Sequence, residues 1–257
     1  MIHLFALLSL LLCGVCYTGF QNSSHFHNTS NRRSLLLLVF GGALLLRLLL
    51  AYTTHGFSND IACFAAWADR IFTLGPGQFY SAEMFTDYPP GFMYVLYLIG
   101  ALRSLLQIPY YSDLHILLLK LPAILCDIAC GFLLYREAVK RLHFSDLQGI
   151  FAASAYLFQP AVILNSSCWG QVDSVYTLMI ILMCLFLMKG NLLPAYAVYG
   201  LGVLLKPQML SFTPVLLAGI WDHVFLQDFS WRKFFYNLCG GLVVICGMLL
   251  LCAPFGL

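Results

Sequence analysis

Four short strings of polar and aromatic residues interrupt an otherwise apolar sequence, and each carries side chains capable of chemistry. They are Asn59-Asp60, Asp87-Tyr88-Pro89-Pro90, Trp169-Gly170-Gln171-Val172-Asp173-Ser174 and Lys206-Pro207-Gln208. A carboxylate can deprotonate an incoming hydroxyl as a general base, and a lysine can neutralise a phosphate leaving group. Trp and Tyr rings can stack on a sugar or hold a lipid at the membrane interface. Together these residue types indicate a phosphorylated lipid that carries a sugar as the substrate.

Each string also has a purely structural interpretation. Asp60 could cap a helix N-terminus, where Asn and Asp are favoured. The string that begins at Asp87 could be a rigid helix start, because Pro suits the first turn. Trp169 and Tyr88 could be ordinary aromatic residues of the membrane interface. Taken singly, no string decides between these readings and a functional one.

Buried charges add a further alternative. Asp173 and Lys206 could pair with each other or with nearby groups, which would make their burial tolerable. Lys120 and Asp127 lie in one apolar segment and are expected to serve packing or pairing. The four strings come from distant parts of the sequence but are expected on one face of the membrane, and this coincidence favours the functional reading.

The elements that position these strings must be membrane helices, because the composition excludes a soluble globular domain. The 257 residues are 61% hydrophobic and 9% charged, whereas soluble domains average about 25% charged residues. The net charge is only +2 and no basic stretch alternates with aromatic residues, which disfavours a nucleic-acid partner. Most of the ten cysteines lie in apolar runs without metal-binding spacing, so we expect buried thiols and no metal site.

The apolar blocks predict an all-α, polytopic protein with about seven to eight spans, since a spanning helix needs about 20 apolar residues. The expected spans are residues 34–52, 114–135, 150–164, 172–188, 192–205, 209–221 and 234–252. Residues 53–113 form the first outer loop. Within it, residues 60–74 predict a helix that lies parallel to the membrane. Residues 92–106 predict a second surface helix or a re-entrant one, and the charge distribution favours the surface helix.

Lysines and arginines set the predicted orientation. Their clusters fall on one side, taken as the cytosol, if residues 92–106 do not cross; these clusters are Arg32/Arg33, Arg136/Lys140/Arg141, Lys189 and Arg232/Lys233. The four polar strings then face the lumen or the cell exterior. Residues 1–33 form a hydrophobic segment and a short polar linker before the membrane domain, residues 34–257. The hydrophobic segment lacks the preceding basic residue of a signal peptide. A cleaved signal would also leave Arg32 and Arg33 outside, so an N-out helix fits the charges better.

At this point the sequence resembles a known family. The resemblance rests on the order Asn59-Asp60 with Trp67, Asp87-Tyr88-Pro89-Pro90-Gly91, Lys120-Leu121-Pro122 with Asp127, Trp169-Gly170-Gln171-Val172-Asp173-Ser174 and Lys206-Pro207-Gln208. This order is similar to that of the polytopic glycosyltransferases of the GT-C fold. The closest likeness is to mannosyltransferase-like proteins related to the second mannosyltransferase of GPI-anchor synthesis. A similar order occurs in dolichyl-phosphate-glucose glucosyltransferases.

The resemblance implies an inverting transfer of a sugar, with mannose favoured, from a polyprenyl- or dolichyl-phosphate donor to a glycan or glycolipid acceptor. The lipid-phosphate sugar is a substrate, and no cofactor or metal is expected. The family's catalytic aspartate lies early in the first outer loop, where its match is Asp60. Lys206 and Gln208 are expected to stabilise the departing phosphate. The remaining expected substrate-binding residues are Asn59, Asp87, Tyr88, Trp169, Gln171 and Asp173.

The resemblance also bears on location and completeness. It favours the endoplasmic reticulum membrane, with a bacterial plasma membrane as the alternative. Members of the fold usually carry further membrane helices after the matched stretch, so we expect this sequence to lack the C-terminal part of such an enzyme. Two other classes stay open. One is a lipid or solute transporter, which would move a labelled solute without sugar transfer; the other is an inactive accessory subunit that binds another membrane protein.

Overall fold

The structure, a computed structural model, describes residues 9–12, 14–15, 17–19, 32–81, 84–227 and 229–257. Within these residues the chain forms helices and loops and no β-strand, which confirms the predicted all-α fold. Most of the predicted N-terminal segment, residues 1–33, lies outside the described residues. The described chain divides into two compact units, each built from two stretches of sequence. The first comprises Met1–Ala62 and Tyr110–Ser174, and the second comprises Cys63–Pro109 and Val175–Leu257.

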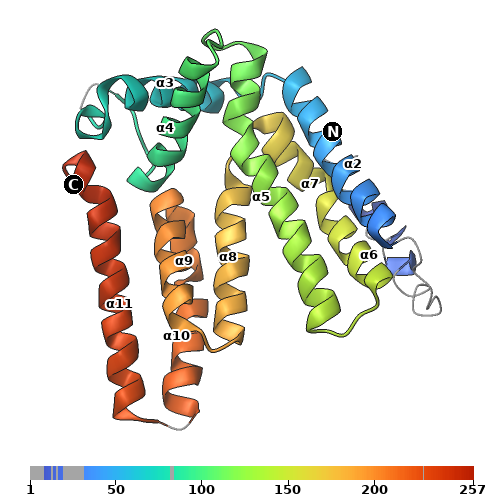
Figure 1. The fold of residues 1–257 in the computed structure, drawn as a ribbon, viewed down its shortest axis with the longest axis vertical. Helices are drawn as coiled ribbons and strands as arrows, with labels where there is room; N and C mark the ends of the chain where they lie inside the picture. The colour runs from blue at the N-terminus through green and yellow to red at the C-terminus, as the bar shows by residue number, and fades with distance from the viewer. Residues whose placement is uncertain (1–8, 13, 16, 20–31, 82–83, 228) are drawn as a thin grey trace. The chain divides into compact units, whose positions relative to one another are not determined.

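Three helices make up most of the first unit. They are α2 (Arg32–Thr53), α5 (Asp113–Lys140) and α6 (Asp146–Leu157), and they lie side by side (Figure 1). Their shared core contains Ala43, Tyr135, Ile150, Ala153 and Leu157. α6 begins with a capping box in which the side chains and backbone N–H groups of Ser145 and Gln148 bond reciprocally, and this fixes the helix start at the turn after α5.

The predicted helix at residues 150–164 was wrong as a single continuous element. α6 ends at Leu157, and the chain resumes in the one-turn helix α7 (Pro160–Ile163) and the π-helix η2 (Leu164–Trp169). The two parts are bent by 51°. Pro160 explains the break, because proline lacks a backbone N–H and forces the preceding residue out of helical geometry. Gln159 accordingly has φ −62° and ψ 119°.

The second unit contains the later helices of the chain and most of residues 53–113. α3 (Ser58–Leu74) and α8 (Asp173–Met188) begin in the first unit and continue into the second. The other elements of the second unit are η1 (Pro76–Gln78), α4 (Pro90–Leu105), α9 (Leu192–Leu205), η3 (Pro207–Phe212), α10 (Thr213–Trp221), η4 (Asp222–Leu226), α11 (Trp231–Cys252) and η5 (Ala253–Phe255). α9 packs against α4, α10 and α11 (Figure 1). Met183, Ala195 and Met209 are fully buried at the centre of this unit.

The predicted membrane-parallel helix at residues 60–74 forms as α3, but its apolar stripe packs inside the protein. Ile61, Phe64, Ala65 and Ala68 are each at most 2% exposed. On the polar side, Asp69 forms an ion pair with Arg103 of α4. α3 therefore has the predicted periodicity, whereas protein side chains cover the face that we expected to contact lipid.

The described residues contain four helical segments long and apolar enough to cross a membrane. They are Arg32–Thr53, Asp113–Lys140, Pro207–Leu226 and Trp231–Phe255. The bent pair of α6 with α7 and η2 makes a fifth if it counts as one span. α8 and α9 are apolar but have only 16 and 14 residues. The chain is thus compatible with an integral, multi-pass membrane protein, and the count of about seven to eight spans stays a prediction.

Candidate functional site

The Asp60 carboxylate is held by two side chains that come much later in the sequence but belong to the same unit. Its Oδ2 accepts a hydrogen bond from Nε1 of Trp169 at 2.9 Å and from Nε2 of Gln171 at 2.5 Å. Among the described residues, no hydrogen bond reaches its Oδ1. Asp60 is half-buried and Trp169 is 49% exposed, so the carboxylate lies at an accessible surface. One carboxylate oxygen is thus fixed by two donors, while the other accepts no hydrogen bond from the described residues.

The helix-capping interpretation of Asp60 does not fit this geometry. α3 begins at Ser58, and its first backbone hydrogen bond runs from Ile61 N to Phe57 O at 3.1 Å. Asp60 is therefore the third residue of the helix, not the residue before it. Its carboxylate accepts from distant side chains, whereas a capping carboxylate accepts from the N–H groups of its own helix.

Two glycines bring the Trp169 string against the start of α3. Gly170 ends η2 in the left-handed conformation, with φ +88°. Gly56 has φ +79°, and a Cβ atom there would lie 2.7 Å from the carbonyl oxygen of Trp169. Phe57 N donates to that same carbonyl at 2.9 Å, and its ring lies 5.2 Å from the Trp169 ring. A side chain at position 56 would prevent this approach, because glycine alone adopts positive φ without a steric cost.

Asp173 has a partner that the sequence did not reveal. Its Oδ2 accepts a hydrogen bond from Nδ2 of Asn165 at 2.9 Å. The carbonyl oxygen of Asn165 in turn accepts from the backbone N–H groups of Gly170 and Gln171. Asn165 thus fixes both the carboxylate at the start of α8 and the turn that carries Gln171. Asn165 therefore holds the Asp173 carboxylate in place next to the turn that carries Gln171.

Lys206 lies in the second unit between two tyrosine rings. Its Nζ is 5.7 Å from the ring centroids of both Tyr88 and Tyr176, a distance at which a cation is attracted to an aromatic face. The side chain is only 7% exposed. Pro207 causes α9 to end here, because the residue before a proline prefers an extended backbone, and Lys206 has φ −153° and ψ 125°. The sequence indicated Tyr88, but no signal in it indicated Tyr176.

Tyr88 belongs to an aromatic cluster that includes residues of α3 and α4. Its ring lies 5.6 Å from Phe64, 5.7 Å from Trp67 and 5.2 Å from Phe92. The Tyr80 hydroxyl donates to the Tyr88 carbonyl at 2.9 Å. Tyr88 is therefore a packed residue of this cluster, with its ring also facing the Lys206 ammonium.

The other predicted binding residues are on the surface. Asn59, Asp87 and Gln208 are all exposed, and Asp87 makes no hydrogen bond or ion pair within the part of the chain that the structure describes. The structure thus brings Asp60, Trp169 and Gln171 together in the first unit, and Tyr88 and Lys206 together in the second. It gives Asn59, Asp87 and Gln208 no such partners among the described residues. Across the described residues, no group of three His, Cys, Asp or Glu side chains gathers as a metal site.

A buried ion pair lies between α2 and α5. Nε of Arg47 is 3.1 Å from Oδ2 of Asp127, and both side chains have no exposed surface. Three hydroxyl groups also donate to this carboxylate, from Ser166 at 2.6 Å, Ser174 at 2.5 Å and Tyr156 at 3.2 Å. Nη2 of Arg47 donates to the Leu157 carbonyl at 2.7 Å. The predicted pairing role of Asp127 is confirmed, and the sequence missed only the identity of its partner.

Lys120 lies on the same helix as Asp127, α5, but its side chain contacts the residues at the end of α2. Its buried Nζ donates to the carbonyl oxygens of Ala51, at 3.2 Å, and Thr54, at 2.6 Å, and approaches Oγ1 of Thr54 at 3.1 Å. These carbonyls lie in the last turn of α2 and directly after it, where a cation is favoured by the helix dipole. Lys120 therefore ties α5 to the end of α2, directly before the turn that contains Gly56.

Comparison with known proteins does not assign this chain to a family. No model of a known protein family matches the sequence, and no curated protein matches it. The site residues therefore rest on their own geometry and on the order of motifs in the sequence.

Proposed function

We propose that this chain is a membrane glycosyltransferase that moves a sugar from a polyprenyl- or dolichyl-phosphate donor to an acceptor hydroxyl. The observation that carries the proposal is the environment of Asp60. Its Oδ2 is held by Trp169 and Gln171 while Oδ1 accepts no hydrogen bond from the described residues. A general base needs such an arrangement, since it must be oriented and still be accessible to the proton that it removes.

In the proposed reaction, Oδ1 of Asp60 removes the proton from the acceptor hydroxyl. The acceptor oxygen forms a bond to the anomeric carbon as the bond between that carbon and the lipid phosphate breaks. The phosphate leaves with the electron pair, and attack from the opposite face inverts the configuration of the sugar. A base of this kind contributes about 10²–10⁴-fold to the rate.

The proposal assigns the phosphate to Lys206. An ammonium between two tyrosine rings is a compact cation that can stabilise the developing charge on a leaving phosphate. The exposed Trp169 ring is suited to stacking on a sugar face, and Asp173 and Gln171 to shaping the acceptor pocket. In this proposal the fold is of the GT-C type, the sugar is mannose and the location is the endoplasmic reticulum membrane.

The direct test is transfer of labelled mannose from polyprenyl-phosphate-mannose in membranes that express the chain. We expect transfer by the wild type, and its near-complete loss in Asp60→Asn with normal membrane insertion. Asp113→Asn is the matched control, because Asp113 also lies in the first turn of a helix in the first unit but is 52% exposed, 3.7 Å from His55. Substantial transfer by Asp60→Asn would refute the role of the base. No transfer by a stable, inserted wild type would favour the accessory-subunit interpretation.

A further inference from the structure

The carboxylate of Asp127 binds both ends of the segment that carries Trp169 and Gln171. Its Oδ2 accepts a hydrogen bond from the Ser166 hydroxyl at 2.6 Å, and its Oδ1 accepts one from the Ser174 hydroxyl at 2.5 Å. Trp169 and Gln171, the two donors to the proposed base, lie between these serines in the sequence. One side chain of α5 therefore anchors the segment on either side of the two donors.

Each serine is close in the sequence to one of the donors. Ser166 lies in η2 three positions before Trp169, and Ser174 lies in the first turn of α8 three positions after Gln171. The turn between them is also bonded internally, since the Asn165 carbonyl oxygen accepts from the backbone N–H of Gln171 at 2.9 Å. A displacement of either serine should therefore displace a donor side chain, because hydrogen bonds behind a site hold its side chains in place.

The contacts of Asp127 are buried away from water. Asp127 and Ser166 have no exposed surface, and Ser174 is 5% exposed. The Ser166 hydroxyl also lies 3.1 Å from the Val162 carbonyl oxygen, but its contact with the carboxylate is shorter and is assisted by charge. Nε of Arg47 pairs with the carboxylate at 3.1 Å. Loss of either serine contact would leave a buried polar group unsatisfied, so the folded protein keeps both.

The same helix also holds the segment that leads to Asp60. Lys120 lies seven residues before Asp127, which is about 10.5 Å, or nearly two turns, along α5 and on the same face. Its Nζ donates to the Thr54 carbonyl at 2.6 Å, shortly before α3 begins at Ser58. α5 thus carries one contact for the segment of the proposed base and another for the segment of its two donors.

We propose that Asp127 is a positioning residue that acts through Ser166 and Ser174. It keeps the donors of the Trp169 string at hydrogen-bonding distance from Asp60. Its effect on catalysis rests on the proposed function, whereas its effect on the orientation of the Trp169 string does not, so the two can be measured separately. Because the carboxylate is fully buried, it acts through these serines and not on a substrate.

Alanine variants of the two serines test the anchor without changing the buried Arg47–Asp127 pair. Ser166→Ala and Ser174→Ala each remove one hydroxyl and leave the two charges together, so both proteins should fold. Ser145→Ala is the matched control in the first unit. The Ser145 hydroxyl caps α6, so its loss should lower stability without a change at the Trp169 string.

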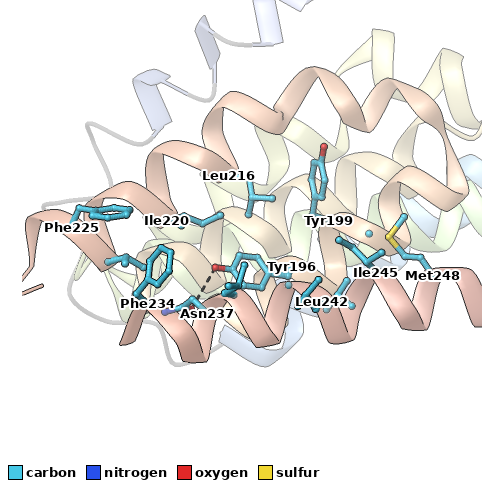
Figure 2. Close-up of a pocket in the computed structure, with 15 residues that line it drawn as sticks. Tyr196, Tyr199, Leu216, Ile220, Phe225, Phe234, Asn237, Leu242, Ile245 and Met248 are labelled. Carbon is cyan, nitrogen blue, oxygen red and sulfur yellow. Dashed lines mark hydrogen bonds between the residues drawn. The ribbon is translucent and has the colours of Figure 1, made fainter. Parts of the chain in front are cut away.

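A second control lies in the second unit. The Tyr196 hydroxyl donates to Oδ1 of Asn237 at 3.4 Å, in the pocket between α9, α10 and α11 (Figure 2). Tyr196 is only 8% exposed. Tyr196→Phe therefore removes a buried hydroxyl that belongs neither to the contacts of Asp127 nor to the Trp169 string.

The test combines fluorine NMR with transfer assays on the full chain in detergent, with fluorotryptophan in place of tryptophan for the NMR. The sequence contains four tryptophans, and Trp169→Phe identifies the Trp169 signal by its loss. Ser166→Ala and Ser174→Ala should each shift this signal, while Ser145→Ala and Tyr196→Phe leave it in place. In the transfer assay, each of the two anchor variants should lower kcat about tenfold, as for loss of a hydrogen bond to a charged group, with the KM for the donor unchanged.

An unmoved Trp169 signal in both anchor variants would overturn the proposal, whether or not the wild type transfers sugar. An equal shift in Ser145→Ala would also overturn it, since lower stability alone would then explain the effect. Shifted signals in a chain that shows no transfer would support the anchor and count only against the proposed function. Shifted signals with a wild-type kcat would show that the anchor does not position the base, and the proposal would fail.

Discussion

The indole N–H of Trp169 donates to the same carboxylate oxygen of Asp60 that accepts from Gln171. The two donors lie 109 and 111 residues after the acceptor in the sequence. The orientation of the Asp60 carboxylate therefore depends on the tertiary fold of the first unit, and variants that alter this fold should alter transfer.

Removing the indole donor should reduce transfer while the protein remains folded. Trp169→Phe keeps an aromatic ring against Phe57 but lacks the N–H group, and a hydrogen bond to a charged group contributes about 1.5–3 kcal/mol. We expect a decrease of about tenfold or more in kcat, measured by transfer of labelled sugar. Trp221→Phe, at an exposed tryptophan of α10, should have no effect. Unchanged transfer by Trp169→Phe would mean that the indole does not position the base.

Loss of the buried cation should weaken use of the lipid-phosphate donor. Lys206→Ala removes the ammonium from between Tyr88 and Tyr176, and we expect the KM for the donor to rise about tenfold, because hydrogen bonds to charged groups contribute about 1.5–3 kcal/mol. Lys206→Arg should retain part of the donor binding, since it keeps the charge. Lys189→Ala removes an exposed lysine and is the control. If donor affinity and rate both stayed at wild-type values in Lys206→Ala, the phosphate role would be wrong.

Removing only one of the two charges in the buried Arg47–Asp127 pair should lower the free energy of unfolding. Arg47→Met leaves the carboxylate buried without its cation, so we expect a loss of about 3–5 kcal/mol in the free energy of unfolding. The double variant Arg47→Met with Asp127→Leu should be more stable than either single variant, because no charge is then left unpaired. Thermal unfolding in detergent measures both effects.

The control for this pair lies on the same helix as Asp127. Arg136→Met breaks the half-buried contact with Glu137, and exposed or partly exposed pairs contribute only about 0–1 kcal/mol. Equal losses in Arg47→Met and Arg136→Met would contradict the difference in burial between the two pairs.

Alanine variants at two glycines with nearly the same backbone φ can distinguish the effect of backbone strain from that of a steric clash. Gly56 has φ +79° and Gly75 has φ +76°, but a Cβ atom would lie 2.7 Å from the Trp169 carbonyl oxygen at Gly56 and would meet nothing within 4 Å at Gly75. Alanine at either position should incur about 1–3 kcal/mol of backbone strain. Only Gly56→Ala should also displace Trp169 from Asp60 and reduce transfer. Transfer assays and thermal unfolding of both variants would show the difference, and equal transfer by the two would argue against it.

The stability of the second unit should decrease at alkaline pH through Tyr80. Burial, and to a smaller extent a charge on Cys252, raise the pKa of its phenol from 10.0 to about 12. The folded protein therefore holds this proton more tightly than the unfolded chain. The contribution to stability is complete below pH 10 and is lost as the pH rises from 10 to about 12. Tyr80→Phe should reduce this decrease in unfolding experiments across that range, and an unchanged pH profile would contradict the assignment.

The sequence predicted several elements of this fold well because their signals are local. The predicted span at residues 192–205 coincides with α9, since Pro207 ends the helical pattern at a defined point. The spacing of the apolar residues in α3 also correctly predicted that this segment is a helix. The break at Pro160 was present in the sequence as a proline, but the apolar character of the flanking residues outweighed it in the prediction.

The partners of the polar residues, in contrast, could not be predicted from the sequence. The sequence alone marked Asp60, Trp169, Gln171, Tyr88, Lys206 and Asp127 as unusual, because polar groups in apolar segments are costly and need a reason. It could not show that Trp169 and Gln171 meet at one oxygen of Asp60, that Arg47 pairs with Asp127, or that Tyr176 faces Lys206. Residue type determines which groups need a partner, whereas helix packing and the turns at Gly56 and Gly170 decide which partner comes within hydrogen-bonding distance.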